Sequence, residues 1–138
     1  MREIEFRGKI LFDNEQWKWI TGDLEHFTAS DGREMVRIRP KSGHKEIVIQ
    51  KTVGQYIGLK DDNGVKIYEG DVVDVVPILG IHFRGVVKFN NHTSAFDVFR
   101  EERGDSACLK DDFSVEVRGN VFDNPEFKKY KEVYFRED

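Results

Sequence analysis

The sequence predicts a mainly β fold of antiparallel coiled sheets, with one short helix near the C-terminus. Hydrophobic residues alternate with polar ones through most of the 138 residues, and this period of two is the spacing of strands. Residues that favour turns recur at roughly ten-residue intervals between these stretches, as they do in sandwiches and small barrels. The 11 Phe, 4 Tyr and 2 Trp side chains supply enough bulk for a folded core.

The first 52 residues predict a series of short strands. Apolar positions that alternate over 4–12 and continue to Phe27 indicate one or two strands and a hairpin, and further strands are expected at 35–39 and 46–51. Trp17 and Trp19 are expected to share a strand face. This pair could belong to the core, form a subunit contact or serve as a platform for stacking. The expected turns are at Asp13-Asn14, 21–23, 30–32 and 40–44.

The centre of the chain gives the clearest hairpin signal. Asn63-Gly64 lies between β-rich stretches and is the favoured two-residue turn, in which both central positions need positive φ. A turn at 69–71 then leads into a Val-rich strand that ends at Pro77. The strands of this part are expected at 72–76, 83–89, 95–99 and 113–122, with turns at 90–94 and 104–107.

One stretch near the end of the chain predicts a helix. Asn124 stands at the N-cap, Pro125 at the first helical position and Glu126 in the first turn, which together favour a helix over about 125–130. We expect this helix to pack Phe127 and Tyr130 onto the sheet. The tail at 133–135 is expected to return as an edge strand.

The pattern indicates a single domain over 1–138 that contains two modules. An N-terminal β module covers about 1–52, and a barrel-like module covers about 53–138. Within the second module, 66–121 has the layout of an SH3-like barrel: a Gly-Asp turn, a Val-rich strand, a loop and a second strand at 85–89. This analogy concerns the fold alone and assigns no function.

The sequence contains none of the motifs that indicate catalysis, a metal or a cofactor. The single Cys108 excludes an internal disulfide framework, and the four histidines lack the spacing of zinc ligands. No phosphate-binding glycine loop or nucleophile elbow occurs. Adjacent carboxylates such as Asp61 and Asp62 make poor acid–base pairs, because neighbours on a strand point to opposite faces. We therefore expect no catalytic, cofactor-binding or metal-binding residue, and no enzyme.

The sequence also predicts no association with a membrane. No run of 18 apolar residues occurs, and the charged first five residues lack the apolar segment of a signal peptide. We expect a soluble protein in the cytoplasm.

A basic segment over 33–51 contrasts with the acidic remainder of the chain. It holds six Lys and Arg against two Glu, a net charge of +4, whereas the whole chain carries −4. Alternation with Val36 and Ile38 places Arg37 and Arg39 on one strand face. Three interpretations stay open: a solvated strand face, a ribbon along a nucleic-acid backbone, and a contact with an acidic neighbouring subunit. The candidate contact residues are Arg33, Arg37, Arg39, Lys41 and Lys45.

Three stretches of the chain carry a resemblance to a known family. They are REIEFR at 2–7, QYIGLKDDNGVKIYEGDVV at 55–73 and GNVFDNPE at 119–126, of which the central one is the most specific. Together they are similar to the YopX family of phage and prophage proteins, and they extend over nearly the whole chain. The family often has Thr where Ile57 stands and Glu where Asp123 stands. The basic segment has no counterpart among these motifs.

The resemblance implies a mostly β, homo-oligomeric protein of bacterial viruses and prophages, without an established activity or cofactor. Turn chemistry dominates the matching motifs, so we interpret their residues as structural. These residues are Tyr56, Gly58, Asn63, Gly64, Tyr68, Gly70, Asp71, Gly119, Asn120, Asn124 and Pro125.

The leading functional hypothesis is a non-enzymatic accessory protein of a phage or prophage in the bacterial cytoplasm. It would bind a host or phage protein, or a second copy of itself. The alternative is a nucleic-acid-binding module that uses the basic segment. A hydrolase or nuclease without a recognisable motif is the third hypothesis.

Overall fold

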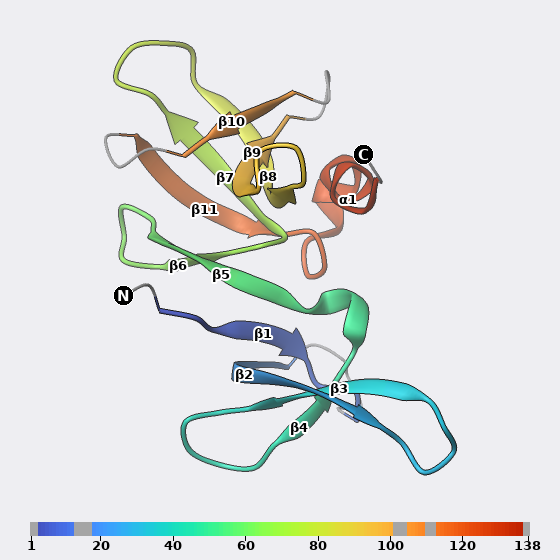
Figure 1. The fold of residues 1–138 in the computed structure, drawn as a ribbon. Helices are drawn as coiled ribbons and strands as arrows, with labels where there is room; N and C mark the ends of the chain where they lie inside the picture. The colour runs from blue at the N-terminus through green and yellow to red at the C-terminus, as the bar shows by residue number, and fades with distance from the viewer. Residues whose placement is uncertain (1–2, 13–17, 101–104, 110–112, 137–138) are drawn as a thin grey trace. The chain divides into compact units, whose positions relative to one another are not determined.

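The computed structural model describes residues 3–12, 18–100, 105–109 and 113–136, and the chain divides into two compact units, 1–56 and 57–138. The described residues form two antiparallel sheets and one short α-helix near the C-terminus (Figure 1). The predicted fold class is therefore confirmed. The single domain over 1–138 stays a prediction, and each unit is described by itself below.

The first unit is an antiparallel sheet with the strand order β4-β3-β2-β1-β5. Its strands are β1 (Phe6–Lys9), β2 (Trp19–Thr28), β3 (Glu34–Arg39), β4 (Glu46–Val48) and the start of β5 (Gly54–Lys60). A 3₁₀ turn (Gln50–Thr52) leads into β5. Val36, Ile38 and Val48 form the buried core of this unit, because alternate residues of β3 and β4 face inward.

The turn predicted at 30–32 is confirmed, whereas the turn predicted at 21–23 is wrong. Ala29 and Arg33 close the first one with a backbone hydrogen bond of 2.8 Å, and Gly32 has a φ of +88°. Residues 21–23 instead lie inside β2, where Gly22 has a φ of +154°. Glycine there permits a close approach of backbone within a strand.

One further expectation for this unit is corrected, and others fall on residues that the structure does not describe. The strand predicted at 46–51 ends at Val48, because the 3₁₀ turn takes the next residues. The Asp13-Asn14 turn and Trp17 fall outside the described residues. Trp19 begins β2, and its ring lies under the Arg7 guanidinium at 4.7 Å and the Lys9 ammonium at 5.5 Å.

The second unit contains a five-stranded antiparallel sheet with the order β10-β9-β8-β7-β11. Its elements are β6 (Lys66–Tyr68), β7 (Asp71–Val76), β8 (Phe83–Asn90), β9 (Ala95–Phe99), β10 (Ser106–Cys108), β11 (Ser114–Asn120), a 3₁₀ turn (Pro125–Phe127) and α1 (Lys128–Phe135). The predicted strands at 72–76, 83–89, 95–99 and 113–122 are confirmed with small changes at their ends. β5 continues into this unit and is the neighbour of β6.

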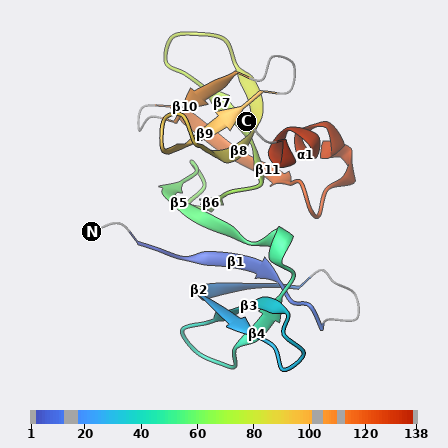
Figure 2. The same cartoon turned by 45° about the vertical axis from the view of Figure 1, so that its right-hand side comes forward.

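The five-stranded sheet packs a core on each of its faces. Val73 and Val75 of β7 belong to one core, together with residues of β8, β9 and β11. Val72 points to the other face and joins the core that holds Phe127 and Val133. Helix α1 lies against this second face in both views of the ribbon (Figures 1 and 2). Alternation along β7 therefore fixes which residues meet the helix.

The hairpin predicted at Asn63-Gly64 is present, but its turn type differs. Gly64 has a φ of +81°, whereas Asn63 does not adopt positive φ, so the two-residue turn with two left-handed positions is wrong. The loop is longer: Asp61 N–H donates to the Val65 carbonyl at 2.8 Å, and Gly64 N–H donates to the Asp61 carbonyl at 3.0 Å. The Asp61 carboxylate supports this longer loop from inside.

The C-terminal helix is longer than predicted and starts differently. The prediction at 125–130 covers a 3₁₀ turn and only the first residues of α1, which continues to Phe135 and replaces the predicted edge strand at 133–135. Asn124 is not a side-chain cap, because its Oδ1 accepts the Asn120 N–H at 3.0 Å instead. The predicted packing of Phe127 and Tyr130 is confirmed.

Among the described residues, the five-stranded sheet does not close into a barrel. The two sheets are nevertheless consistent with a small barrel-like fold. The SH3-like comparison stays a prediction. One element was missed: β10 occupies part of the predicted turn at 104–107, where Ser106 pairs with Phe99 of β9. Its three residues, Ser-Ala-Cys, are too few to show a period of two.

Candidate functional site

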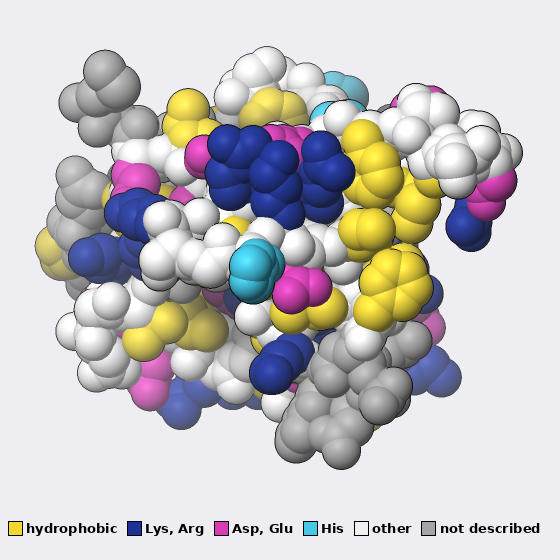
Figure 3. All heavy atoms as spheres, turned by 90° about the horizontal axis from the view of Figure 1, so that it is seen from below, with side chains coloured by type: hydrophobic (Ala, Val, Ile, Leu, Met, Phe, Trp, Pro, Cys, Tyr) yellow, Lys and Arg dark blue, Asp and Glu magenta, His cyan; other side chains and the backbone are white. Residues whose placement is uncertain are grey.

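Three of the five candidate basic residues meet around one carboxylate in the first unit. Glu25 of β2 lies opposite Arg37 of β3. Its Oε2 is 2.7 Å from Arg37 Nε and 3.3 Å from Lys45 Nζ, and its Oε1 is 2.6 Å from Arg39 Nη2. All four side chains are partly exposed. Figure 3 shows Lys and Arg side chains gathered beside acidic ones on the face that it presents. We call these four residues the Glu25 cluster.

The Glu25 cluster keeps an excess of positive charge. The hydrogen bond from Arg37, helped by Lys45 and Arg39 and opposed by desolvation, lowers the pKa of Glu25 from 4.5 to about 2. The carboxylate is therefore ionised at neutral pH, and one negative charge faces three cations. These four residues carry a net charge of +2, and Asp23, which lies opposite Arg39 on the same strand face, lowers the net charge of that face to +1. The face can attract an anion, but it also has internal counterions.

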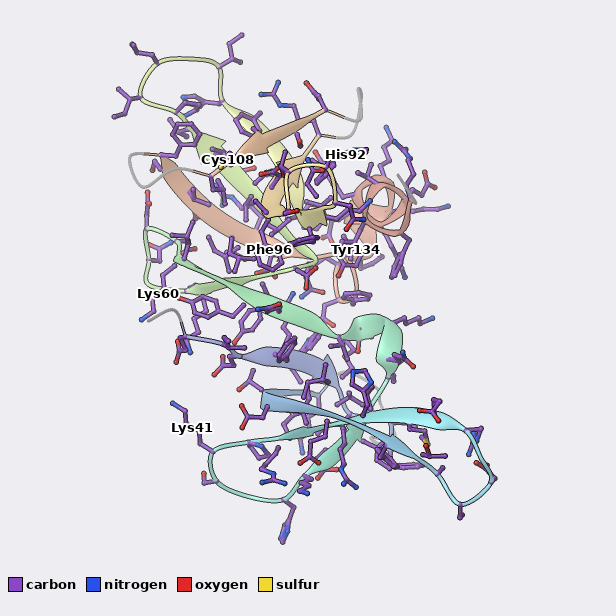
Figure 4. All side chains as sticks on the ribbon, viewed as in Figure 1. Lys41, Lys60, His92, Phe96, Cys108 and Tyr134 are labelled. Carbon is purple, nitrogen blue, oxygen red and sulfur yellow. The ribbon has the colours of Figure 1, made fainter. Side chains whose placement is uncertain are left out.

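The other two candidates lie apart from this cluster. Arg33 is in an ion pair of 2.7 Å with Asp31, at the turn before β3. Its backbone N–H is the main cause that holds the pKa of Asp31 below its ordinary value. Lys41 extends from the loop between β3 and β4 (Figure 4). The predicted ribbon of five cations is therefore a cluster of three with two separate neighbours.

A charged hollow of about 420 Å³ is lined by residues of β7, β8 and β11 in the second unit. Asp74 of β7 binds Arg84 of β8 with contacts of 2.6 and 3.0 Å, and Arg118 of β11 at 2.7 Å. The Arg84 guanidinium, aided by Arg118 and opposed by burial, holds the pKa of Asp74 below its usual value, and Asp74 raises that of Arg84. The two cations are paired internally, which favours a structural role for this network.

The same hollow is lined by residues of hydrolytic sites, but they are not arranged as one. Ser114 Oγ donates a hydrogen bond to the Asp62 carboxylate. His82 also lines the hollow. Among the described residues no hydrogen bond joins His82 to Ser114, so a serine activated by a base is not assembled here.

The most exposed apolar side chains of the second unit lie in the loop between β7 and β8. Ile78, Leu79 and Ile81 are 71%, 91% and 87% exposed. Beside them is a hollow of about 630 Å³. Its lining residues are Pro77, Leu79, Gly80, Ile81, Phe83, Arg100, Ala107, Cys108 and Phe113. Figure 4 marks Cys108 on β10. We call the three exposed side chains and this hollow the apolar loop surface.

In the apolar loop surface, exposed aliphatic side chains lie beside a hollow that is itself lined mainly by apolar residues. Arg100 is the one charged residue among the described residues that line the hollow, and its guanidinium lies over the Phe83 ring at 4.2 Å. Exposed contiguous apolar patches on soluble proteins mark interaction sites. Sequence analysis missed this surface, although the apolar residues that continue past the strand-ending Pro77 were a usable signal.

The comparison with family models identifies the chain. The model described as YopX protein matches residues 5–127. The chain belongs to the YopX family. A comparison with curated proteins found no match.

The YopX motif residues lie at bends and pairings of the second unit and at the start of β5. Asp71 is buried, and its Oδ2 accepts the Tyr68 N–H at 2.8 Å. Gly70 has a φ of +90° and bonds β8 through the Val87 carbonyl at 2.8 Å. Asn120 Oδ1 accepts the N–H groups of Phe122 and Asp123, just after β11. Tyr56 and Gly58 belong to β5, and Pro125 begins the 3₁₀ turn.

The described part of this YopX-family chain offers no metal site and no membrane helix. No three His, Cys, Asp or Glu side chains there come together as metal ligands. None of the helices in the same residues has the length and apolar character to span a bilayer.

Proposed function

We propose that this chain is a non-enzymatic protein-binding module that acts through the apolar loop surface. The observation behind this proposal is that Leu79 and Ile81 are exposed beside a hollow lined mainly by apolar residues. Burying one such side chain contributes about 1.5 to 3 kcal/mol, so three can dominate an interface. The YopX resemblance supports an accessory role in a phage or prophage, in the bacterial cytoplasm.

A protein fits this surface better than a lipid bilayer does. A bilayer takes up projecting apolar side chains, but it leaves a concave hollow beside them unfilled. A protein partner can fill both. The net charge of −4 also opposes approach to an anionic membrane.

Leu79→Asp is expected to weaken partner binding about tenfold or more, because a charge replaces an apolar anchor. The measurement is capture from lysate of the bacterial host on immobilised chain, quantified by mass spectrometry. Ile4→Asp is the matched control, since Ile4 is an exposed aliphatic residue of the other unit. Equal capture by wild type and Leu79→Asp would contradict the proposal.

A nucleic-acid-binding role is the second candidate, and the Glu25 cluster favours it. Arg37 and Arg39 of β3, with Lys45 just before β4, surround Glu25, and these four residues carry a net charge of +2. The Phe27 ring lies 4.6 Å from the Arg37 guanidinium, next to this charge. Aromatic and basic side chains in such proximity suit single-stranded nucleic acids.

Glu25→Gln and the double variant Arg37→Glu, Arg39→Glu are expected to act in opposite directions on nucleic-acid binding. Glu25→Gln removes the negative charge that neutralises one cation, so that cation can contact a phosphate. The affinity is then expected to rise several-fold, and the slope of its decrease with salt is expected to grow by about the contribution of one phosphate contact. The charge reversal abolishes binding. A gel shift over a salt series measures both, and unchanged affinity in both variants rules the role out.

A further inference from the structure

The two edges of the five-stranded sheet differ in how their backbone groups are used. At β11, Asp62 N–H donates to the Val115 carbonyl at 2.9 Å, and Val117 N–H donates to Asp61 Oδ2 at 3.0 Å. β10, at the other end of the strand order, pairs with β9 alone among the described residues. An extended segment of another protein can therefore add at β10, whereas the loop after β5 already bonds the β11 edge.

The outward backbone groups of β10 follow from its pairing with β9. Arg100 N–H donates to the Asp105 carbonyl at 3.1 Å, just before β10 begins. By the alternation of antiparallel pairs, Ala107 then bonds β9, whereas the N–H and C=O groups of Ser106 and Cys108 point outward. The β10 sequence, Ser-Ala-Cys, contains no Lys or Pro that would discourage strand addition.

A segment that adds at β10 also meets the hollow of the apolar loop surface, because Ala107 and Cys108 line it. The other walls are mainly aliphatic and aromatic, and Arg100 is the one charged residue among the described residues that line them. A hollow of about 630 Å³ with one charged group suits an apolar group that carries a single complementary charge.

The Arg100 side chain is placed to bind an anion. Its guanidinium lies over the Phe83 ring at 4.2 Å, and a guanidinium in such a contact keeps N–H donors for a carboxylate. Asp105 lies opposite Arg100, yet no ion pair joins Arg100 to any of the described residues. A partner that covered this cation without pairing it would leave a charge buried and uncompensated, which is costly. The occupant of the hollow is therefore expected to bring an anionic group.

We propose that this site binds the free C-terminus of a partner protein whose last residue is apolar. In an internal strand segment adjacent side chains point to opposite faces, so an apolar group and a carboxylate on one face come from residues about 7 Å apart. A C-terminal residue carries both groups on one Cα, and the hollow holds apolar walls and Arg100 together. The inference rests on the proposed function and names the chemistry of its partner.

Three kinds of contact act together in this complex. The last residues of the partner form backbone hydrogen bonds with Ser106 and Cys108, the terminal side chain fills the hollow, and the carboxylate accepts hydrogen bonds from Arg100. A second copy that docks through its own 77–82 loop and β10 brings no such group, since neither segment contains Asp or Glu. The charge of Arg100 therefore favours a different protein as the partner.

Peptides with and without a free C-terminus test the proposal on the full chain. The probe is the labelled peptide GSKTVTVL, compared with its C-terminal amide and with a free-acid twin that ends in Ser. Wild type is expected to bind the free acid at least tenfold more tightly than either twin, because the amide lacks the charge and Ser lacks the apolar group. Fluorescence anisotropy measures the three dissociation constants.

Two variants separate the carboxylate contact from the strand addition. Arg100→Gln is expected to bind acid and amide equally, whereas Arg33→Gln keeps the preference, because Arg33 is an exposed arginine of the other unit. Cys108→Pro is expected to weaken the binding of both peptides at least tenfold, because proline removes an outward N–H. Circular dichroism confirms that each variant is folded. Methylated backbone nitrogens in the peptide are expected to have the same effect without any substitution in the protein.

The outcomes separate this inference from the proposed function. The C-terminal site is overturned if no peptide binds, if wild type binds acid and amide equally, or if Arg100→Gln keeps the preference. An amidated peptide with an internal Glu that binds as tightly as the free acid also overturns it. If capture from lysate still depends on Leu79, the protein-binding function stands, and its partner uses an internal segment or is a second copy. If capture is also indifferent to Leu79→Asp, both fail.

Discussion

Asp61→Ala is expected to lower the free energy of unfolding by about 3 to 5 kcal/mol. Asp61 is only 7% exposed. Its Oδ1 accepts the N–H groups of Asn63 and Val65, each at 2.9 Å, and its Oδ2 accepts that of Val117 at 3.0 Å. Alanine leaves three donors without their acceptor and removes one of the attachments of the loop to β11, although the bonds of Asp62 to Ser114 and Val115 remain. Urea unfolding followed by circular dichroism measures the loss.

Asp61→Asn is the matched control, because it keeps the size of the side chain and one acceptor oxygen. Its amide group faces at least one backbone N–H, so we expect a loss smaller than that of Asp61→Ala but still measurable. A change below about 1 kcal/mol for Asp61→Ala would show that the loop closes without this carboxylate.

The same residue predicts a dependence of stability on pH. Burial would raise the pKa of the Asp61 carboxyl, but the N–H groups of Val117, Val65 and Asn63 together hold it below its ordinary value of 3.8. A depressed pKa in the folded state stabilises the fold above the unfolded pKa. This contribution is lost as the pH falls through the folded value, below about pH 4. Asp61→Asn should therefore weaken the acid sensitivity of unfolding.

Local chemistry made much of the second unit predictable from sequence. Apolar residues bounded by turn residues located β7, β8 and β9, whose neighbouring residues pack on opposite faces of one sheet, and period-two alternation located β11, whose valines pack on one face. The hairpin at 61–65 was also predicted, but its turn type was not. The carboxylate of Asp61, through a bond to a residue 56 positions away, supports the longer loop, and no local pattern contains such a contact.

The candidate site was also predictable only in part from the sequence. Placing Arg37 and Arg39 on one face was correct, since alternation alone determines it. Their partner Glu25 requires the register of β2 on β3, which follows once the turn at 30–32 is centred on Asp31. The apolar loop surface involves residues of β10, whose three positions carry no period, so the hollow appears only in the fold.

The wrongly predicted turn at 21–23 points to a position where glycine is indispensable. Gly22 lies within β2, and its neighbour across the sheet is the end of β3. A Cβ built there would be 2.0 Å from the Arg39 carbonyl oxygen and 2.9 Å from Pro40 Cα. Both are backbone atoms, so the clash cannot be relieved by a side-chain rotation.

Gly22→Ala is therefore expected to destabilise the first unit more than Gly32→Ala, by about 2 kcal/mol or more. Both glycines have positive φ, +154° and +88°, so both substitutions carry backbone strain. No atom lies within 4 Å of a Cβ at Gly32, whereas Gly22 adds the collision with Arg39. Urea unfolding, with Trp fluorescence as the probe, measures the difference. Equal destabilisation by the two variants would mean that β3 moves away freely, and that the sheet face carrying Arg37 and Arg39 is not rigidly held.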